Sequence, residues 1–120
     1  MATVKLIHLT KRFGKKVVAV KDLSLEVHDQ EFLVLLGPSG CGKTTTMRMI
    51  AGLEEVTDGA VLIDDVDVTD MPPRKRNVSM VFQNYAVWPH MTVYDNIAYP
   101  LKLKKRRNLT LIALSIMWRR

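Results

Sequence analysis

Residues 37–45 carry the glycines and side chains that proteins use to bind phosphate. They read GPSGCGKTT, and Gly37, Gly42, Lys43 and Thr44 match the pattern G-x-x-x-x-G-K-[ST] (Walker A). Glycines permit backbone angles with positive φ, so that successive N–H groups can point inward at an anion. In this pattern the lysine contacts the β- and γ-phosphates of a nucleotide, and the hydroxyl of the threonine is one ligand of Mg²⁺.

The segments on either side of this phosphate loop, residues 37–45, have the character that the motif requires. Residues 32–36 are continuously apolar and predict a central parallel strand, and residues 42–51 predict a helix that stops at Gly52. The N-terminus of that helix adds free N–H donors and the positive end of its dipole. We therefore predict bound ATP with Mg²⁺ rather than a glycine-rich turn that matches by chance. The predicted contacts are Gly37, Pro38, Ser39, Gly40, Cys41, Gly42, Lys43, Thr44 and Thr45.

The remaining elements suggest an α/β fold. Strands are predicted over residues 4–9, 17–27, 60–63 and 78–82, from apolar runs or from alternation of apolar and polar side chains. Thr92 and Asp95 have the spacing of a capping box at the start of a helix, which we expect Pro100 to end.

The positive charge of the chain is concentrated at one end. The net charge is +6, but residues 101–120 hold seven of the 18 Lys and Arg and none of the 12 Asp and Glu. A nucleic-acid-binding function would depend on this tail alone, and we expect no nucleic-acid partner. We separate residues 104–120, a basic and apolar tail, from a domain over residues 1–103.

The composition also indicates a location. No apolar run reaches the roughly 18 residues that span a bilayer, and the N-terminus lacks the apolar core of a secretory signal. The single cysteine, Cys41, allows no internal disulfide, which agrees with a reducing compartment. We expect a cytoplasmic protein.

Four stretches together resemble one family of ATPases. They read LTKRFG (9–14), EFLVLLGPSGCGKTTTMRMIAGLE (31–54), GAVLID (59–64) and VSMVFQNYAVWPHMTVYDNIAYPLK (78–102). From residue 3 to about residue 103 the chain resembles the N-terminal half of an ATP-binding cassette (ABC) transporter ATPase of the sugar-importer branch. The resemblance implies a P-loop NTPase core with parallel strands and a helix, plus an antiparallel β subdomain, present here incompletely.

The resemblance also implies roles for residues outside the phosphate loop. Phe13 matches an aromatic residue that stacks on adenine, with Val18 packing nearby, although a core residue at the end of a strand is the alternative. Gln83 matches a glutamine whose side-chain carbonyl reaches Mg²⁺ or the attacking water, and a surface amide is the alternative. Lys43 and Gln83 are thus the catalytic candidates, and Thr44 and Gln83 the metal ligands.

Further implied features concern partners. Residues 84–99 correspond to the face that receives a helix of the membrane permease subunits, and we expect Tyr85, Trp88, Met91 and Tyr94 to be largely exposed there. The resemblance implies a homodimer of ATPase subunits, peripheral on the inner face of the cell membrane. The transported solute depends on subunits that this chain does not contain.

One stretch imitates the acidic strand end of P-loop ATPases. Residues 61–65 read VLIDD, but the alternation continues through Val66 and Val68, which favours a hairpin turn at Asp64 and Asp65. A self-contained P-loop kinase or NTPase with one of these acids on Mg²⁺ is the alternative function. We find no LSGGQ-type signature and no later strand ending in Asp-Glu, so we expect a truncated form that binds ATP without hydrolysing it. A frame shift near residue 104 would explain the loss of acidic residues in the tail.

Overall fold

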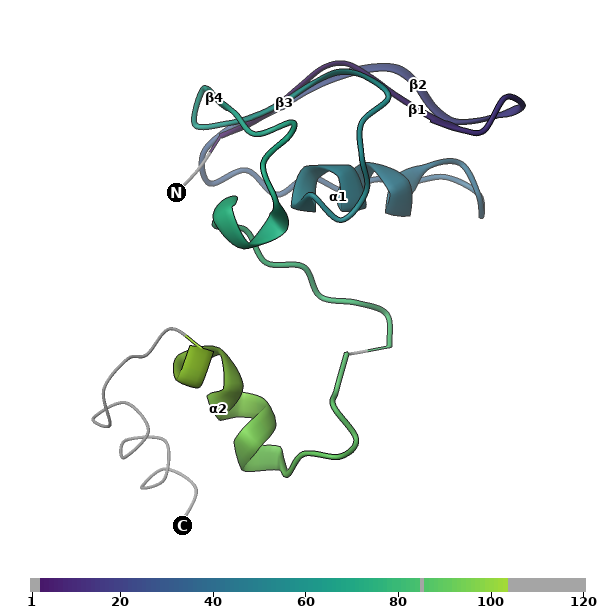
Figure 1. Ribbon diagram of the computed structural model, residues 1–120. Coiled ribbons are helices and arrows are strands. Elements are labelled where there is room, and N and C mark those ends of the chain that lie inside the picture. Colours follow the sequence, from purple (N-terminus) through teal and green to yellow (C-terminus); the bar gives the residue numbers. More distant parts are fainter. Residues whose placement is uncertain (1–2, 85, 104–120) are drawn as a thin grey trace. The chain divides into compact units, whose positions relative to one another are not determined.

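The computed structural model describes residues 3–84 and 86–103 (Figure 1). The chain divides into two compact units, Met1–Met80 and Val81–Arg120, which we describe one at a time. The tail over residues 104–120, and the frame shift proposed for it, lie outside the described residues, as does Tyr85.

The first unit contains a four-stranded antiparallel sheet. Its strands are β1 (Val4–Phe13), β2 (Val17–Val27), β3 (Asp58–Ile63) and β4 (Val66–Asp67), in the order β2-β1-β3-β4. Both alternating segments at the N-terminus are therefore strands, as predicted, and they pair with each other across the turn at residues 14–16. The third predicted strand, over residues 60–63, lies within β3.

The helix α1 (Lys43–Ala51) packs along one face of this sheet (Figure 1). Met49 of α1 is fully buried together with Leu9 of β1 and Val61 of β3. The rest of the core is formed by Leu6, Val20, Ile63 and Val68. Burial of these side chains is the main favourable term that holds α1 against the sheet.

The end of α1 follows the sequence prediction. Gly52 has φ 75°, and its N–H donates to the Met49 carbonyl at 3.1 Å, while the N–H of Leu53 donates to the Arg48 carbonyl at 2.8 Å. A left-handed glycine with these two bonds is the common way to satisfy the last carbonyls of a helix.

Two predicted strands are absent from the described residues, and both predictions were wrong. Residues 32–36 and 78–82 form no strand, and Phe32, Leu36 and Val81 are 90, 87 and 88% exposed. A strand inside a parallel sheet exists only where neighbouring strands accept and donate its backbone hydrogen bonds. The four strands of this sheet pair with one another instead, so these two apolar runs stay unpaired in the described structure.

The hairpin expected at residues 61–65 is confirmed. Asp64 and Asp65 connect β3 to β4, with φ values of 51° and 60°. Two successive residues with positive φ form the two-residue turn that matches the twist of an antiparallel pair. The chain then passes through η1 (Pro73–Lys75), a single turn of 3-10 helix with Pro73 at its first position.

The second unit contains the helix α2 (Val93–Leu103). Its start is confirmed as a capping box: the Asp95 N–H donates to the Thr92 hydroxyl at 3.1 Å, and that hydroxyl donates to the Asp95 carboxylate at 2.8 Å. Its predicted end was wrong, because Pro100 lies inside the helix. Lys102 reaches back two turns to Asp95 at 2.6 Å, and this ion pair holds the turn that follows the proline.

Candidate nucleotide-binding site

The backbone of the phosphate loop adopts the left-handed angles that glycine favours. Gly40 has φ 79° and Gly42 has φ 96°, and α1 begins at the next residue, Lys43. No side chain caps this start, and no acidic residue lies in the first turn. The first N–H groups of a helix have no partner within the helix, so this uncapped start presents donors and a partial positive charge suited to an anion.

The Lys43 side chain folds back over the loop. Its ammonium donates to the carbonyls of Gly37 at 2.6 Å and Pro38 at 2.7 Å, and it contacts the Cys41 sulfur at 3.3 Å. An ammonium has three donors, and these three partners use them all. The positive charge is therefore held at the centre of the loop, where a phosphate oxygen would compete with the two carbonyls for it.

The loop lies directly against β2. A Cβ added to Gly42 would lie 2.4 Å from the Ala19 carbonyl oxygen and 3.1 Å from Val20. Only glycine allows so close an approach of two backbones. Four residues after Gly42, Thr46 is buried, and both its N–H, at 2.8 Å, and its hydroxyl, at 3.0 Å, donate to the Gly42 carbonyl.

The residues predicted to bind adenine lie on the strands β1 and β2, close in sequence or by strand pairing to Ala19, which Gly42 approaches. Val18 precedes Ala19 on β2 and pairs with Arg12, and Phe13 pairs with Val17 at the end of β1. The side chains of Phe13 and Val18 are 44% and 50% exposed. Phe13 is therefore not a core residue, which was the alternative interpretation of this position. The Lys11 ammonium lies 4.9 Å from the centre of the Phe13 ring. Their contact with a base stays a prediction.

A cavity of about 360 Å³ opens beside the loop. Its polar wall contains Gly42, Lys43 and Thr46, and its apolar wall is formed by β2 and residues 34–36. Its volume lies in the range of pockets that hold small molecules. The predicted metal ligand Thr44 is exposed in the first turn of α1 and is not among the residues that line this cavity.

The two acids of the hairpin lie far from the loop. Asp64 bonds Thr3 at the start of β1, through its N–H at 3.0 Å and its carboxylate at 2.9 Å, and Asp65 pairs with Lys5 at 2.9 Å. The loop, in contrast, contacts Val20, which pairs with Lys11. Thr3, directly before β1, and Lys11 are eight residues apart, which corresponds to about 26 Å of extended chain at roughly 3.3 Å per residue. The carboxylates therefore cannot reach a phosphate in the loop.

Gln83 belongs to the second unit. It is exposed and lies in a turn with Asn84. Its predicted contact with Mg²⁺ or water involves the phosphate loop of the first unit and stays a prediction.

The predicted partner surface is also in the second unit. Trp88 and Tyr94 are 40 and 39% exposed, as expected, whereas Met91 is half-buried. The Trp88 backbone is held by the Asn96 amide, which accepts from its N–H at 2.9 Å and donates to its carbonyl at 3.1 Å. The Trp88 and Tyr99 rings lie 4.8 Å apart at 53°. These contacts hold the exposed Trp88 side chain in one position.

Sequence reasoning missed two residues that shape the site. Thr46 closes the first turn of α1, and Arg76 bonds the last turn of the same helix. A threonine directly after the motif is weak evidence by itself, and Arg76 is one of three consecutive basic residues of which only it is buried. Its role depends on contacts across 26 and 27 residues, which no local pattern reveals.

Comparison with known proteins identifies the family. A family model described as ABC transporter matches residues 20–118. The chain belongs to the ABC transporter family. Among solved structures, the dimeric bacterial ABC transporter cassette MJ0796 superposes with a TM-score of 0.76 and 30% identity, over 88% of this chain and 50% of that one. The predicted α/β fold of a P-loop NTPase with an antiparallel β subdomain, present incompletely, is thereby confirmed.

Two of the relatives that match the chain are named as ATP-binding proteins of importers. The trehalose/maltose import ATP-binding protein MalK of Thermococcus litoralis is 60% identical over 111 residues, and the oligosaccharides import ATP-binding protein MsmX of Bacillus subtilis is 53% identical over 105 residues. Each match covers 88% of this chain. The chain spans about three tenths of the length of these relatives. In its described part, no helix is both long and apolar enough to cross a membrane.

Proposed function

We propose that this chain is the ATP-binding component of an ABC importer for sugars, in which ATP binding and hydrolysis drive transport. The family and the ATP-binding role come from the family match, and the sugar class is supported by the names of MalK and MsmX. The observation that carries the proposal at the level of the site is the uncapped start of α1 with the Lys43 ammonium held beside it.

The loop residues suit the triphosphate of a nucleotide. The N–H groups at the start of α1 bind phosphate oxygens, and Lys43 exchanges its two carbonyl partners for the β- and γ-phosphates. A second structure of MJ0796, at TM-score 0.75 and 32% identity, holds ADP and Pi, which supports a nucleotide in the same family of cassettes. Bound Mg²⁺ would neutralise charge on the phosphates, with Thr44 and Gln83 as its protein ligands.

The base would lie at the far end of the β1–β2 hairpin. The Phe13 ring offers an accessible planar surface for stacking on adenine, and Val18 offers apolar contact beside it. Both residues are joined to the loop through β2, which Gly42 contacts. Such an arrangement would place the base and the phosphates on one side of the first unit.

The second unit is proposed to dock membrane permease subunits. Three exposed apolar side chains of α2, namely Val93, Tyr94 and Ile97, lie near the ordered Trp88 in sequence and suit an apolar partner. A cysteine in place of Trp88 in the assembled transporter should crosslink to a cytoplasmic loop of a permease. Failure to crosslink in a transporter that still imports its solute would refute this surface.

Dimerisation and location follow from the same proposal. MJ0796 forms a dimer, and this supports a homodimer of ATP-binding subunits for this protein as well. Assembled with permeases, the protein would lie on the cytoplasmic face of the cell membrane as a peripheral subunit. Gel filtration with and without ATP would detect the dimer.

Nucleotide binding is the property to test first. Lys43→Ala removes a charge-assisted contact to phosphate, which costs about 1.5–3 kcal/mol or roughly 10- to 100-fold in affinity. Lys75→Ala removes an exposed lysine of η1 and serves as the matched control. Titration calorimetry with MgATP should show weaker binding for the first variant only. An unchanged dissociation constant for Lys43→Ala would remove Lys43 from the site.

A further inference from the structure

Arg76 is the most completely bonded basic side chain of the first unit, and it is 5% exposed. Its guanidinium donates to the carbonyls of four residues in two separate segments. These bonds go to Met49 at 2.7 Å, Ile50 at 3.0 Å, Thr69 at 2.8 Å and Met71 at 2.7 Å. The side chain therefore joins the last turn of α1 to the segment that follows β4.

The bonds to α1 meet a need that every helix has. The last carbonyls of a helix lack partners inside it and carry a partial negative charge. Arg76 supplies two donors and a positive charge at that end, in addition to the N–H groups of Gly52 and Leu53. Burial lowers the pKa of Arg76, and the nearby charges of Asp67 and Asp70 oppose that effect. An arginine remains charged in proteins in any case.

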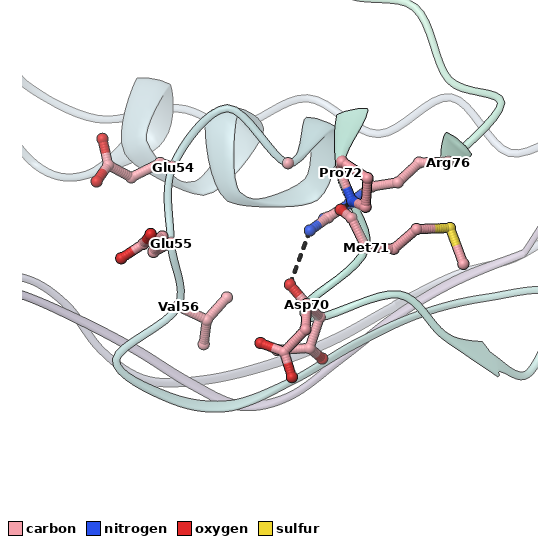
Figure 2. Close-up of a pocket in the computed structure, with 9 residues that line it drawn as sticks. Glu54, Glu55, Val56, Asp70, Met71, Pro72 and Arg76 are labelled. Atoms are coloured by element: carbon pink, nitrogen blue, oxygen red, sulfur yellow. Dashed lines mark hydrogen bonds between the residues drawn. The ribbon is translucent and has the colours of Figure 1, made fainter. Parts of the chain in front are cut away.

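Gly52 makes room for this arrangement. A Cβ at Gly52 would lie 2.6 Å from Nε and 2.8 Å from Cζ of Arg76, so only glycine lets the guanidinium lie against the helix end. Both residues line a pocket of about 320 Å³, and Figure 2 shows the Arg76 side chain turned back along its wall toward residues 69–71. The turned-in direction explains why Arg76 is buried while Arg74 and Lys75 are exposed.

Because α1 is short, the contacts at its C-terminal end also affect the direction of its N-terminal end. Nine residues rise about 13 Å, and an isolated helix shorter than about 12 residues is marginal in water. The direction of α1 thus depends on what holds it. Its start is held by glycine backbone and by Thr46, whereas its end is held by a network of four hydrogen bonds.

We infer that Arg76 is a positioning residue for the nucleotide site: by fixing the C-terminal turn of α1 to residues 69–71, it sets the direction in which the N-terminal turn presents its N–H groups and Lys43 to phosphate. This inference rests on the proposed function of the phosphate loop. Arg76 itself touches no part of the loop; it acts through the helix.

The test compares two buried residues in the 120-residue chain, with MgADP as the probe. Arg76→Ala removes the guanidinium, and Leu6→Ala opens a cavity in the sheet without removing a bond to α1. Arg76→Ala should raise the dissociation constant about tenfold, the lower end of the loss caused by removing orienting groups at metal sites. Guanidinium chloride at millimolar concentration should fill the space and restore the affinity. Leu6→Ala should lower the melting temperature but bind MgADP like wild type once folded, and guanidinium should not change its affinity.

Two results would overturn the inference. One is a folded Arg76→Ala variant that binds MgADP as tightly as wild type. The other is a loss of affinity equal to that of Leu6→Ala with no response to guanidinium. If Arg76→Ala does not fold, Arg76→Lys takes its place, because an ammonium has three donors and cannot replace all four bonds of the guanidinium; wild-type affinity in that variant also overturns the inference. Absence of MgADP binding by wild type, or equal binding by Lys43→Ala, would instead refute the proposed function.

Discussion

The two helices of this chain begin in opposite ways. α2 begins with a capping box, in which the Thr92 hydroxyl accepts from the Asp95 N–H and Asp95 in turn pairs with Lys102. α1 begins directly after Gly42, with no side-chain cap and no acid in its first turn. Every helix start leaves donors without partners inside the helix. In α2 the chain's own side chains meet this need, and in α1 the donors remain available to a ligand.

The difference between the two helix starts indicates which of them can bind an anion. At the start of α2 the Thr92 hydroxyl accepts from a backbone N–H and the negative charge of Asp95 lies at the positive end of the dipole, as a phosphate would, so α2 is closed to an anion. The start of α1 combines free donors with the Lys43 ammonium, while its other end is secured by Gly52 and Arg76. A helix fixed at one end and open at the other is suited to binding a ligand without moving.

The largest expected effect concerns hydrolysis. The open start of α1 has Lys43, and neither acid of the hairpin reaches it, because Asp64 bonds Thr3 and Asp65 pairs with Lys5, near the start of β1. Loss of a general base or of a charge stabiliser costs on the order of 10² to 10⁴ in rate each. The 120-residue chain should therefore release no more phosphate from MgATP than its Lys43→Ala variant does. Turnover that disappears in both Lys43→Ala and Asp64→Asn would favour a self-contained P-loop enzyme.

The next largest effect is expected at the glycine that precedes α1. Gly42→Ala would force a side chain into φ 96° and against the Ala19 carbonyl, so MgATP affinity should fall roughly 10- to 100-fold, in line with a strain of about 1–3 kcal/mol. Gly40→Ala has a similar φ of 79° but open space around it, and its loss should be smaller. Titration of both variants with MgATP measures the difference. Equal losses would show that the close approach to β2 is unimportant for binding.

A smaller effect is expected at Cys41, an exposed thiol whose sulfur lies 3.3 Å from the Lys43 ammonium. A nucleotide in the loop would cover the thiol and draw the ammonium toward phosphate. MgATP should therefore slow alkylation of Cys41 several-fold in wild type and much less in Lys43→Ala. Equal alkylation rates with and without MgATP in wild type would contradict the position of the nucleotide.

The smallest effect belongs to the closed helix start. The pKa of Asp95 is lowered below its usual 3.8 because Lys102 and Thr92 hydrogen-bond the carboxylate. A lowered pKa means that the stabilisation is present above the unfolded value and is lost as the pH falls through the folded value. Amide chemical shifts of residues 93–103 should therefore report fraying of α2 below about pH 4. The Asp95→Asn variant should lack this transition, and an identical transition in both proteins would assign it to another group.

Local patterns accounted for much of this fold. The end of α1 at Gly52, the hairpin at Asp64 and Asp65 and the capping box of α2 each depend on neighbouring residues, and all were predicted. The apolar runs at residues 32–36 and 78–82 were taken for strands and are not, since pairing depends on distant partners that an apolar run does not specify. Pro100 was expected to end α2, but the pair of Lys102 with Asp95 extends the helix past it.

Some residues of the candidate site were likewise predicted from local patterns, and others were not. The phosphate loop was predicted from the spacing of Gly37, Gly42 and Lys43, because the motif is local and each residue type has its own physical reason. Arg76 was not predicted, since it acts on carbonyls of α1 that precede it by 26 and 27 residues. Gln83 and Phe13 were assigned by resemblance, and their contacts with a nucleotide remain predictions.

Hydrogen exchange of the backbone amides of α1 and its loop tests the central claim most directly. The account predicts that MgATP slows exchange in residues 40–45, where donors lack a cap, and leaves exchange in residues 93–96 at the capped start of α2 unchanged. The Lys43→Ala variant should show little protection at the same concentration. Unchanged exchange over residues 40–45 at a saturating concentration of MgATP would contradict the assignment of the open start of α1 as the nucleotide site.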